Sequence, residues 1–224
     1  MKLNTDHFVL AADTLEQGVD FLEERLGINI PFGGVHPTMG THNCLMQLSE
    51  DVFFEIIAIN PESYTNSALH IQHPRWFSLD NPYLQAQLKR QPQLLTWVVN
   101  SRDMQHSTNN GIYRQCTART ITRGDLSWSF ALPDDGSLLA DGLIPYVLQW
   151  FGDHPADRMP TLGCSVVEVN LYHPLKNWLN TQLQEIGAAH LVNVESLDPS
   201  QAPYFELVLQ SPKGKVSLNS KILV

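Results

Sequence analysis

The amino-acid sequence predicts an α+β fold in which βαβββ modules repeat, forming cupped mixed sheets with helices packed on the outside. Two observations lead to this prediction. An amphipathic helix lies between strand-like segments near the start of the chain and again near its end. The middle of the 224-residue chain contains further strand-like segments with room for only a short helix. This length allows one compact unit with a shared core.

A first βαβββ module is predicted over residues 1–62. Residues 6–11 are predicted to form a strand, and Thr14 followed by Gln17 is a capping-box pattern at a helix start. Apolar residues then recur every three or four positions until Gly27, which suits the left-handed residue after a helix. The other expected elements are a short strand near 28–32, a loop with glycine and proline at 31–37, and strands at 43–48 and 52–59.

The same order of elements is predicted for the C-terminal module, residues 163–224. A strand over 165–171 leads to a helix that Pro174 is expected to open. An apolar stripe follows and Gly187 ends it. The string Tyr-Phe-Glu-Leu-Val at 204–208 matches Phe-Phe-Glu-Ile-Ile at 53–57, which favours a repeated supersecondary unit.

Residues 94–152 are interpreted as a degenerate middle module, and residues 63–93 as a helical connection that includes a helix around 83–89. His70, His73 and Trp76 lie in this proline-containing connection, and one interpretation of the segment is a lid over a pocket. The strands expected in the middle module are 94–100, 112–121, 126–132 and 144–150, with a short helix between 103 and 109.

Composition excludes several classes of partner. The formal net charge is −9, from 14 basic and 23 acidic residues, whereas binding to nucleic acid or an anionic membrane needs a cationic face. No signal segment or apolar run of transmembrane length is present, and three cysteines without a CxxC pair are typical of a reduced, cytoplasmic protein. No glycine-rich nucleotide motif occurs, so no nucleotide cofactor is expected.

His7 and Glu55 are the main candidates for chemistry. His7 shares a strand face with Val9, and Glu55 is flanked by apolar residues on both faces of its strand. Burying an unpaired carboxylate is costly, so Glu55 needs a cation, a strong donor or a metal. Imidazole and carboxylate are normal ligands of divalent metals. The pattern also leaves open the alternative that arginine or backbone donors satisfy Glu55 and that His7 is a core histidine.

Several strings resemble the glyoxalase-like domain family of the vicinal-oxygen-chelate superfamily. They are Asp-His-Phe-Val-Leu-Ala at 6–11 with the helix that follows, Gly-Gly-Val-His-Pro-Thr-Met-Gly-Thr-His-Asn at 33–43, and Phe-Glu-Ile-Ile at 54–57. The segment 144–150 resembles a shorter signature of the family. The resemblance implies modules that fold into a cupped sheet with a ligand in the concavity. In the wider superfamily a divalent metal there polarises adjacent oxygens of the substrate.

By this resemblance His7 and Glu55 are metal ligands, with Gln149 as a further oxygen ligand, and Zn, Ni, Mn or Fe as the metal. The sequence departs from the family scheme, in which a second module adds two ligands. Trp97 falls near the middle-module position of His7, and Tyr146 or Gln149 near that of Glu55. In the C-terminal module Glu206 recurs without its histidine, so the carboxylate alternatively has a structural role.

The loop from His36 to Asn43 is the second candidate site. Its glycines allow a ligand to approach the backbone, and its polar residues would lie at the mouth of a pocket. We predict that His36 or His42 supplies acid–base or orienting chemistry; the alternative is a tight turn with both histidines facing solvent. Glu55 and His36 are therefore the predicted catalytic residues, and the predicted substrate-binding residues are His36, Thr41, His42, Asn43, Trp97 and Gln149.

Three functions remain open from the sequence. The first is a small-molecule lyase, isomerase or dioxygenase that acts in the concave pocket, with or without a metal. The second is a non-catalytic protein that sequesters a small molecule in the same cup. The third is protein interaction, because paired modules of this fold often complete their sheets as a homodimer. Fold class alone does not choose among them.

Overall fold

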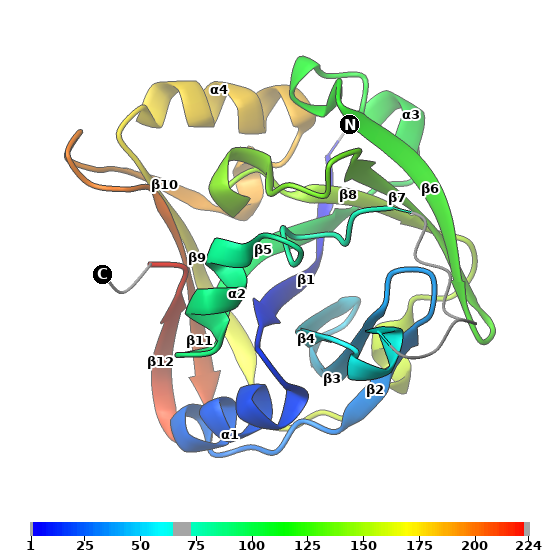
Figure 1. The fold of residues 1–224 in the computed structure, drawn as a ribbon. Coiled ribbons are helices and arrows are strands. Elements are labelled where there is room, and N and C mark those ends of the chain that lie inside the picture. Colours follow the sequence, from blue (N-terminus) through cyan, green and yellow to red (C-terminus); the bar gives the residue numbers. More distant parts are fainter. Residues whose placement is uncertain (1, 65–72, 222–224) are drawn as a thin grey trace.

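The structure is a computed structural model that describes residues 2–64 and 73–221; His70 of the expected lid lies outside them. It confirms the predicted α+β class: two curled sheets with the helices packed outside them (Figure 1). Within the described residues the α-helices are α1 (Leu15–Leu26), α2 (Pro82–Leu88), α3 (Met104–Ser107) and α4 (Lys176–Ile186).

Twelve strands are described, and they fall into two sheets. The larger sheet consists of β1 (Asn4–Ala11), β2 (Phe32–His36), β3 (Thr41–Ser49), β4 (Val52–Ile59), β5 (Gln93–Asn100), β6 (Cys116–Arg123), β7 (Leu126–Pro133) and β8 (Tyr146–Trp150). The smaller sheet consists of β9 (Ser165–His173), β10 (Asn193–Ser196), β11 (Tyr204–Ser211) and β12 (Gly214–Asn219).

The eight-stranded sheet is built from two halves with the same internal order. Its strand order is β2-β3-β4-β1-β5-β8-β7-β6, so each half places its fourth strand beside its first. The pairs β1–β4 and β5–β8 are parallel, and β1 pairs antiparallel with β5 at the centre. One chain therefore completes a continuous curled sheet by itself.

The four-stranded sheet repeats the order of elements but not their pairing. Its strand order is β10-β9-β11-β12, and β11 runs antiparallel to β9, whereas β4 runs parallel to β1. The similar strings around Glu55 and Glu206 therefore occupy different positions in their sheets. In Figure 1, α1 and α4 lie near opposite ends of this smaller sheet.

Helix α1 shows how local sequence sets an element. Thr14 is its N-cap, and the Thr14 hydroxyl accepts a hydrogen bond from the backbone N–H of Gln17 at 3.1 Å. Gly27 ends the helix at φ 75°, and its N–H donates to the carbonyl of Glu23. Both features confirm the sequence prediction.

Three predicted boundaries are wrong because of local hydrogen bonds. Strand β2 occupies the segment expected to be a loop, since its backbone pairs with β3 despite the glycines. Helix α4 begins at Lys176 rather than Pro174, because β9 continues to His173, whose Nδ1 accepts from the Leu175 N–H. Strand β6 begins at Cys116, four residues later than predicted, because a 3-10 turn capped by Asn110 precedes it.

Two apolar clusters cover the two faces of the large sheet. Phe8 and Leu10 of β1 belong to the core between the two sheets, together with Phe205 and Leu207 of β11. Val9 of β1 points to the inner face of the curled sheet. Residues Trp76, Phe77, Val98, Phe130, Tyr146 and Leu148 belong to this inner cluster. The connection between the two halves therefore covers the inner face, where the predicted site lies.

Candidate functional site

A small cavity lies on the inner face of the large sheet, where the two halves meet the connection. Its volume is about 30 Å³, which is enough for one or two water-sized groups. The ionisable and amide side chains that line it are His7, His36, Asn43, Glu55 and Arg123, and its tryptophans are Trp76, Trp128 and Trp150. The cavity therefore has room for only a small group beside a wall that is partly polar.

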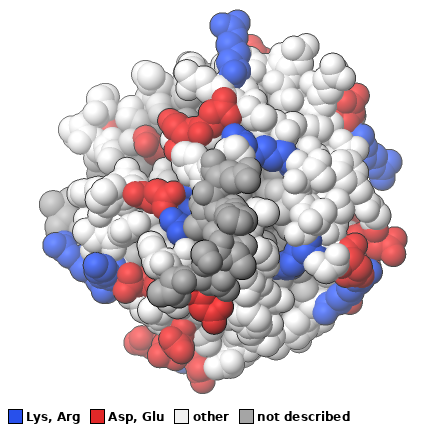
Figure 2. All heavy atoms as spheres, turned by 45° about the vertical axis from the view of Figure 1, so that its right-hand side comes forward, with Lys and Arg blue, Asp and Glu red and all other residues white. Residues whose placement is uncertain are grey.

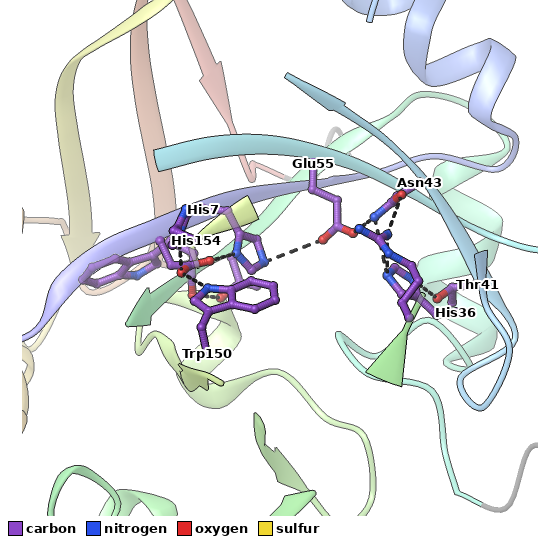
Figure 3. A network of polar contacts seen from close by, with 11 residues as sticks. His7, His36, Thr41, Asn43, Glu55, Trp150 and His154 are labelled. Carbon is purple, nitrogen blue, oxygen red and sulfur yellow. Dashed lines mark hydrogen bonds and ion pairs between the residues drawn. The ribbon is translucent and has the colours of Figure 1, made fainter. Parts of the chain in front are cut away.

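Glu55 is the central carboxylate of this wall, and only 5% of the residue is exposed. Its Oε1 accepts a hydrogen bond from Asn43 Nδ2 at 2.7 Å, and its Oε2 lies 3.7 Å from His7 Nε2. Figure 3 shows Glu55 between two arms of polar contacts, His7 on one side and Asn43 with His36 on the other. The expectation that a carboxylate in this apolar strand is buried and needs partners is confirmed.

The first arm is anchored by Asp6, a fully buried residue that the sequence analysis did not select. Its carboxylate contacts His7 Nδ1 at 2.6 Å and His154 Nε2 at 3.0 Å, and it accepts from Trp150 Nε1 at 2.8 Å. Burial raises the pKa of Asp6, but the hydrogen bonds with His154 and His7 outweigh it and lower the pKa overall. A charged Asp6 favours the tautomer of His7 that carries its proton on Nδ1, and Nε2 lies toward Glu55.

The second arm fixes His36 in one protonation state. The Arg123 guanidinium donates to His36 Nε2 at 3.3 Å, so this nitrogen carries no proton. His36 Nδ1 then donates to the Thr41 hydroxyl at 3.1 Å. Burial lowers the pKa of His36 well below its usual value, and the charge of Arg123 adds to the effect. His36 is therefore neutral at neutral pH, with both ring nitrogens engaged.

Arg123 lies at the end of β6 and is half-buried. Its Nη1 also donates to Asn43 Oδ1 at 3.2 Å, and no Asp or Glu oxygen of the described residues is within ion-pair distance of it. Burial lowers the pKa of Arg123, and Glu55 raises it in part through a longer-range attraction. The cavity thus contains a cation whose nearest contacts are all neutral groups.

The structure does not bring all predicted site residues together. His36 and Asn43 line the cavity, and Thr41 supports His36 from behind. His42 lies on the opposite face of β3 and lines a separate groove beside α1. The other two predicted residues also point away: Trp97 is fully buried between the sheets and donates to the Leu143 carbonyl, and Gln149 accepts from the Met104 N–H.

The donor set does not fit the metal centre that the family resemblance implies. His7 and Glu55 supply two ligands, but no group of three or more His, Cys, Asp or Glu side chains within residues 2–64 and 73–221 is placed to hold a metal. In β5 and β8, Thr96 stands at the position of His7 and Tyr146 at that of Glu55, judged by strand position and register. Their hydroxyls donate to backbone carbonyls instead, so neither side chain completes a metal centre with His7 and Glu55.

Asp6 and Arg123 were not assigned a site role from the sequence, and Trp76 was placed only in the expected lid. Asp6 directly precedes His7, and a paired acid beside a strand histidine was a usable signal. No comparable signal marks Arg123, which is 87 residues from its partner His36. Only the sheet register brings them together.

Surface charge and helix length are relevant to whether the protein binds nucleic acid or a membrane. On the face in Figure 2, acidic and basic side chains are interspersed and form no continuous basic patch. No helix of the described part of the chain is long and apolar enough to cross a membrane.

Comparison with known proteins identifies a family over most of the chain. A family model described as a glyoxalase-like domain matches residues 5–187. No curated protein matches the sequence. A hypothetical protein from Staphylococcus aureus has a similar structure, with 12% identity, a TM-score of 0.57, and coverage of 98% of this chain and 85% of that one.

Two further solved structures are more distant. A mutant 4-hydroxymandelate synthase from Streptomyces coelicolor has 10% identity and a TM-score of 0.47, with 97% of this chain and 62% of that chain covered. A methylmalonyl-CoA epimerase from Mycobacterium tuberculosis has 14% identity and a TM-score of 0.38, with 66% and 86% covered.

Proposed function

The chain belongs to the glyoxalase-like domain family of the vicinal-oxygen-chelate superfamily, and from this premise we propose that it is a small-molecule lyase or isomerase. Its reaction moves a proton to or from a carbon atom next to a carbonyl group. One observation carries the proposal: the buried Glu55 carboxylate lines a cavity that also contains the imidazole of His7 and the guanidinium of Arg123.

In this proposal Glu55 is the catalytic base. A carboxylate that lines a cavity can take a proton from a carbon acid bound within its reach. The hydrogen bond from Asn43 holds Oε1, which leaves Oε2 as the atom that takes the proton. His7, oriented by Asp6, lies 3.7 Å from Oε2 and receives or returns that proton after each transfer.

His36 has a positioning role in this proposal. Its Nε2 accepts from Arg123 and its Nδ1 contacts Thr41, so it holds the guanidinium at the cavity and keeps no nitrogen free for the ligand. The large sheet closes within one chain, so the proposed site needs no second copy.

Hydrogen exchange with solvent tests the proposal without knowledge of the substrate. The protein is incubated in D2O with a panel of small aldehydes, ketones and 2-oxo acids, and proton NMR follows loss of the signal beside the carbonyl. We expect exchange of at least one compound, with Glu55→Gln slowing it by about 10²- to 10⁴-fold. Glu206→Gln is the matched control, because Glu206 lies in the similar string of β11 and hydrogen-bonds to Asn170 instead. Equal rates in wild type and Glu55→Gln would refute Glu55 as the base.

A non-catalytic binding role is the second candidate. The aromatic lining favours it, since Trp76, Trp128 and Phe130 form much of the cavity wall and a sequestering site needs no base. Saturable binding of a panel compound, with no exchange of any compound in D2O, would favour this role over the enzyme.

A further inference from the structure

Two hydrogen-bond donors belong to residues that line the cavity. In the part of the chain that the structure describes, one of them has no acceptor, and the other is a cation with only neutral acceptors. The first is the indole N–H of Trp76, which is buried and has no hydrogen-bond partner within the described residues, in a side chain that is 3% exposed. The second is the Arg123 guanidinium, which contacts only the neutral groups of His36 and Asn43. Buried donors in native proteins are normally satisfied, so such a pair indicates a missing acceptor.

Trp76 and Arg123 line the same cavity, and contacts with neighbouring side chains hold both of them in place. The Trp76 ring packs edge-on against His36, with centroids 4.9 Å apart, and also contacts Phe77 and Phe130. Arg123 is held through the same His36. A cationic donor and a neutral N–H donor fixed around a small hollow are the arrangement that stabilises a developing oxyanion.

We propose that Arg123 and the Trp76 N–H form an oxyanion site, which receives the carbonyl oxygen of a small carbonyl compound as it becomes an enolate. This inference rests on the proposed function and names the residues that would stabilise its charged intermediate. Glu55 takes the proton from carbon, the C–H electron pair forms the carbon–carbon double bond, and the carbonyl π electrons move to oxygen. When Glu55 returns the proton to carbon, these changes are reversed.

The charges of the site suit this step better than they suit a permanently anionic ligand. The attraction of Arg123 for Glu55 ends when Glu55 becomes neutral, and at that moment the negative charge resides on the ligand oxygen. The net charge of the cavity is therefore the same before and after the transfer. A ligand anion that binds while Glu55 is still charged would meet electrostatic repulsion instead.

Binding of acetate tests the site, because acetate presents a planar oxyanion of enolate shape and acetamide is its neutral counterpart. The readout is the indole N–H resonance of Trp76 in a ¹⁵N-labelled protein, assigned by its loss in Trp76→Phe. We expect acetate, but not acetamide, to shift this resonance in a saturable way. Glu55→Gln, which mimics the protonated base, should bind acetate about 10-fold more tightly than wild type, since the repulsion is removed.

Arg123→Gln should weaken acetate binding at least 10-fold, and Arg123→Lys should retain part of it. Arg119→Gln is the matched control, because Arg119 lies on the same strand and pairs with Asp134 at the surface. If Arg123→Gln does not fold, Trp76→Phe provides the same test. Acetate should bind this variant more weakly than wild type, as measured from the shifts of the remaining tryptophan indole N–H resonances. An acetate affinity in either variant equal to that of the wild-type protein, or no acetate binding to Glu55→Gln, would overturn the site.

The outcomes separate this inference from the proposed function. Deuterium exchange that needs Glu55 but is insensitive to Arg123→Gln would support the function and overturn the oxyanion site. Acetate binding that needs Arg123 and strengthens in Glu55→Gln, without exchange of any compound, would support the site and refute the enzyme.

Discussion

The Arg123 guanidinium donates to Nε2 of His36, and this contact joins β6 to β2, the two edge strands of the large sheet. A protonated His36 could not accept that hydrogen bond and would place two buried cations against each other. The neutral imidazole is therefore part of the folded state, which has a measurable consequence for its pH dependence.

Stability should fall as pH decreases below 6.5, the usual pKa of histidine, and His36 should contribute to the fall. Burial and the charge of Arg123 lower its pKa in the folded state, so below 6.5 the unfolded chain binds a proton that the folded chain does not. Urea unfolding of wild type and His36→Gln across this pH range checks the prediction. The variant should show a shallower loss of stability on acidification; an unchanged slope would contradict the assignment.

Asp6→Asn should destabilise the protein strongly, although the side chain keeps its shape. Asp6 accepts from three donors, and an amide offers one acceptor atom where the carboxylate offers two. The free energy of unfolding should decrease by about 3–5 kcal/mol, the cost of breaking a buried charge network. Asp134→Asn, which removes a surface pair with Arg119, should cost under about 1 kcal/mol. Similar losses in both variants would show that the Asp6 network is not special.

The sequence predicts those parts of the site that local patterns control. Strand alternation places His7 on the inner face and shows that Glu55 is surrounded by apolar residues, and both hold in the structure. The positions of Trp97 and Gln149 depend instead on how β5 and β8 pair with their neighbours. Register shifts interrupt the β1–β5 pairing beside Val9, and a shift of one residue exchanges the two faces of a strand.

Arg123 could not be predicted, for a different reason, and Trp76 was predicted only as part of the expected lid. Both residues reach the cavity because the two half-sheets pack against the connection there. No local sequence pattern encodes this packing. Glu55 requires a positive or donating companion on physical grounds, but the sequence contains several arginines that could fill this role. Only the hairpin between β6 and β7 decides that Arg123 reaches the cavity.

Gly33→Ala should disturb the Glu55 environment from a distance. A Cβ at Gly33 would lie 2.6 Å from Asn43 Oδ1 and 2.7 Å from Leu45 Cδ1, so the side chain that hydrogen-bonds to Glu55 must move. Overpacking of this kind costs about 1–3 kcal/mol in the free energy of unfolding. At Gly111 the nearest atom to a new Cβ is Arg114 Nε at 3.7 Å, so Gly111→Ala is the matched control. Chemical denaturation of both variants gives the comparison, and equal stability would contradict the steric argument.

Trp76→Ala should open the inner face of the sheet. The ring is buried against His36, Phe77 and Phe130, so its removal should lower the free energy of unfolding by about 3–5 kcal/mol. The space left has the shape of the lost ring, and added indole should therefore bind there and raise the melting temperature. Trp178→Ala removes a tryptophan that is 38% exposed and should show neither effect. An aromatic-lined hole accepts indole only when its walls stay in place. If indole raises the melting temperature of Trp76→Ala no more than that of Trp178→Ala, the connection collapses when Trp76 is lost.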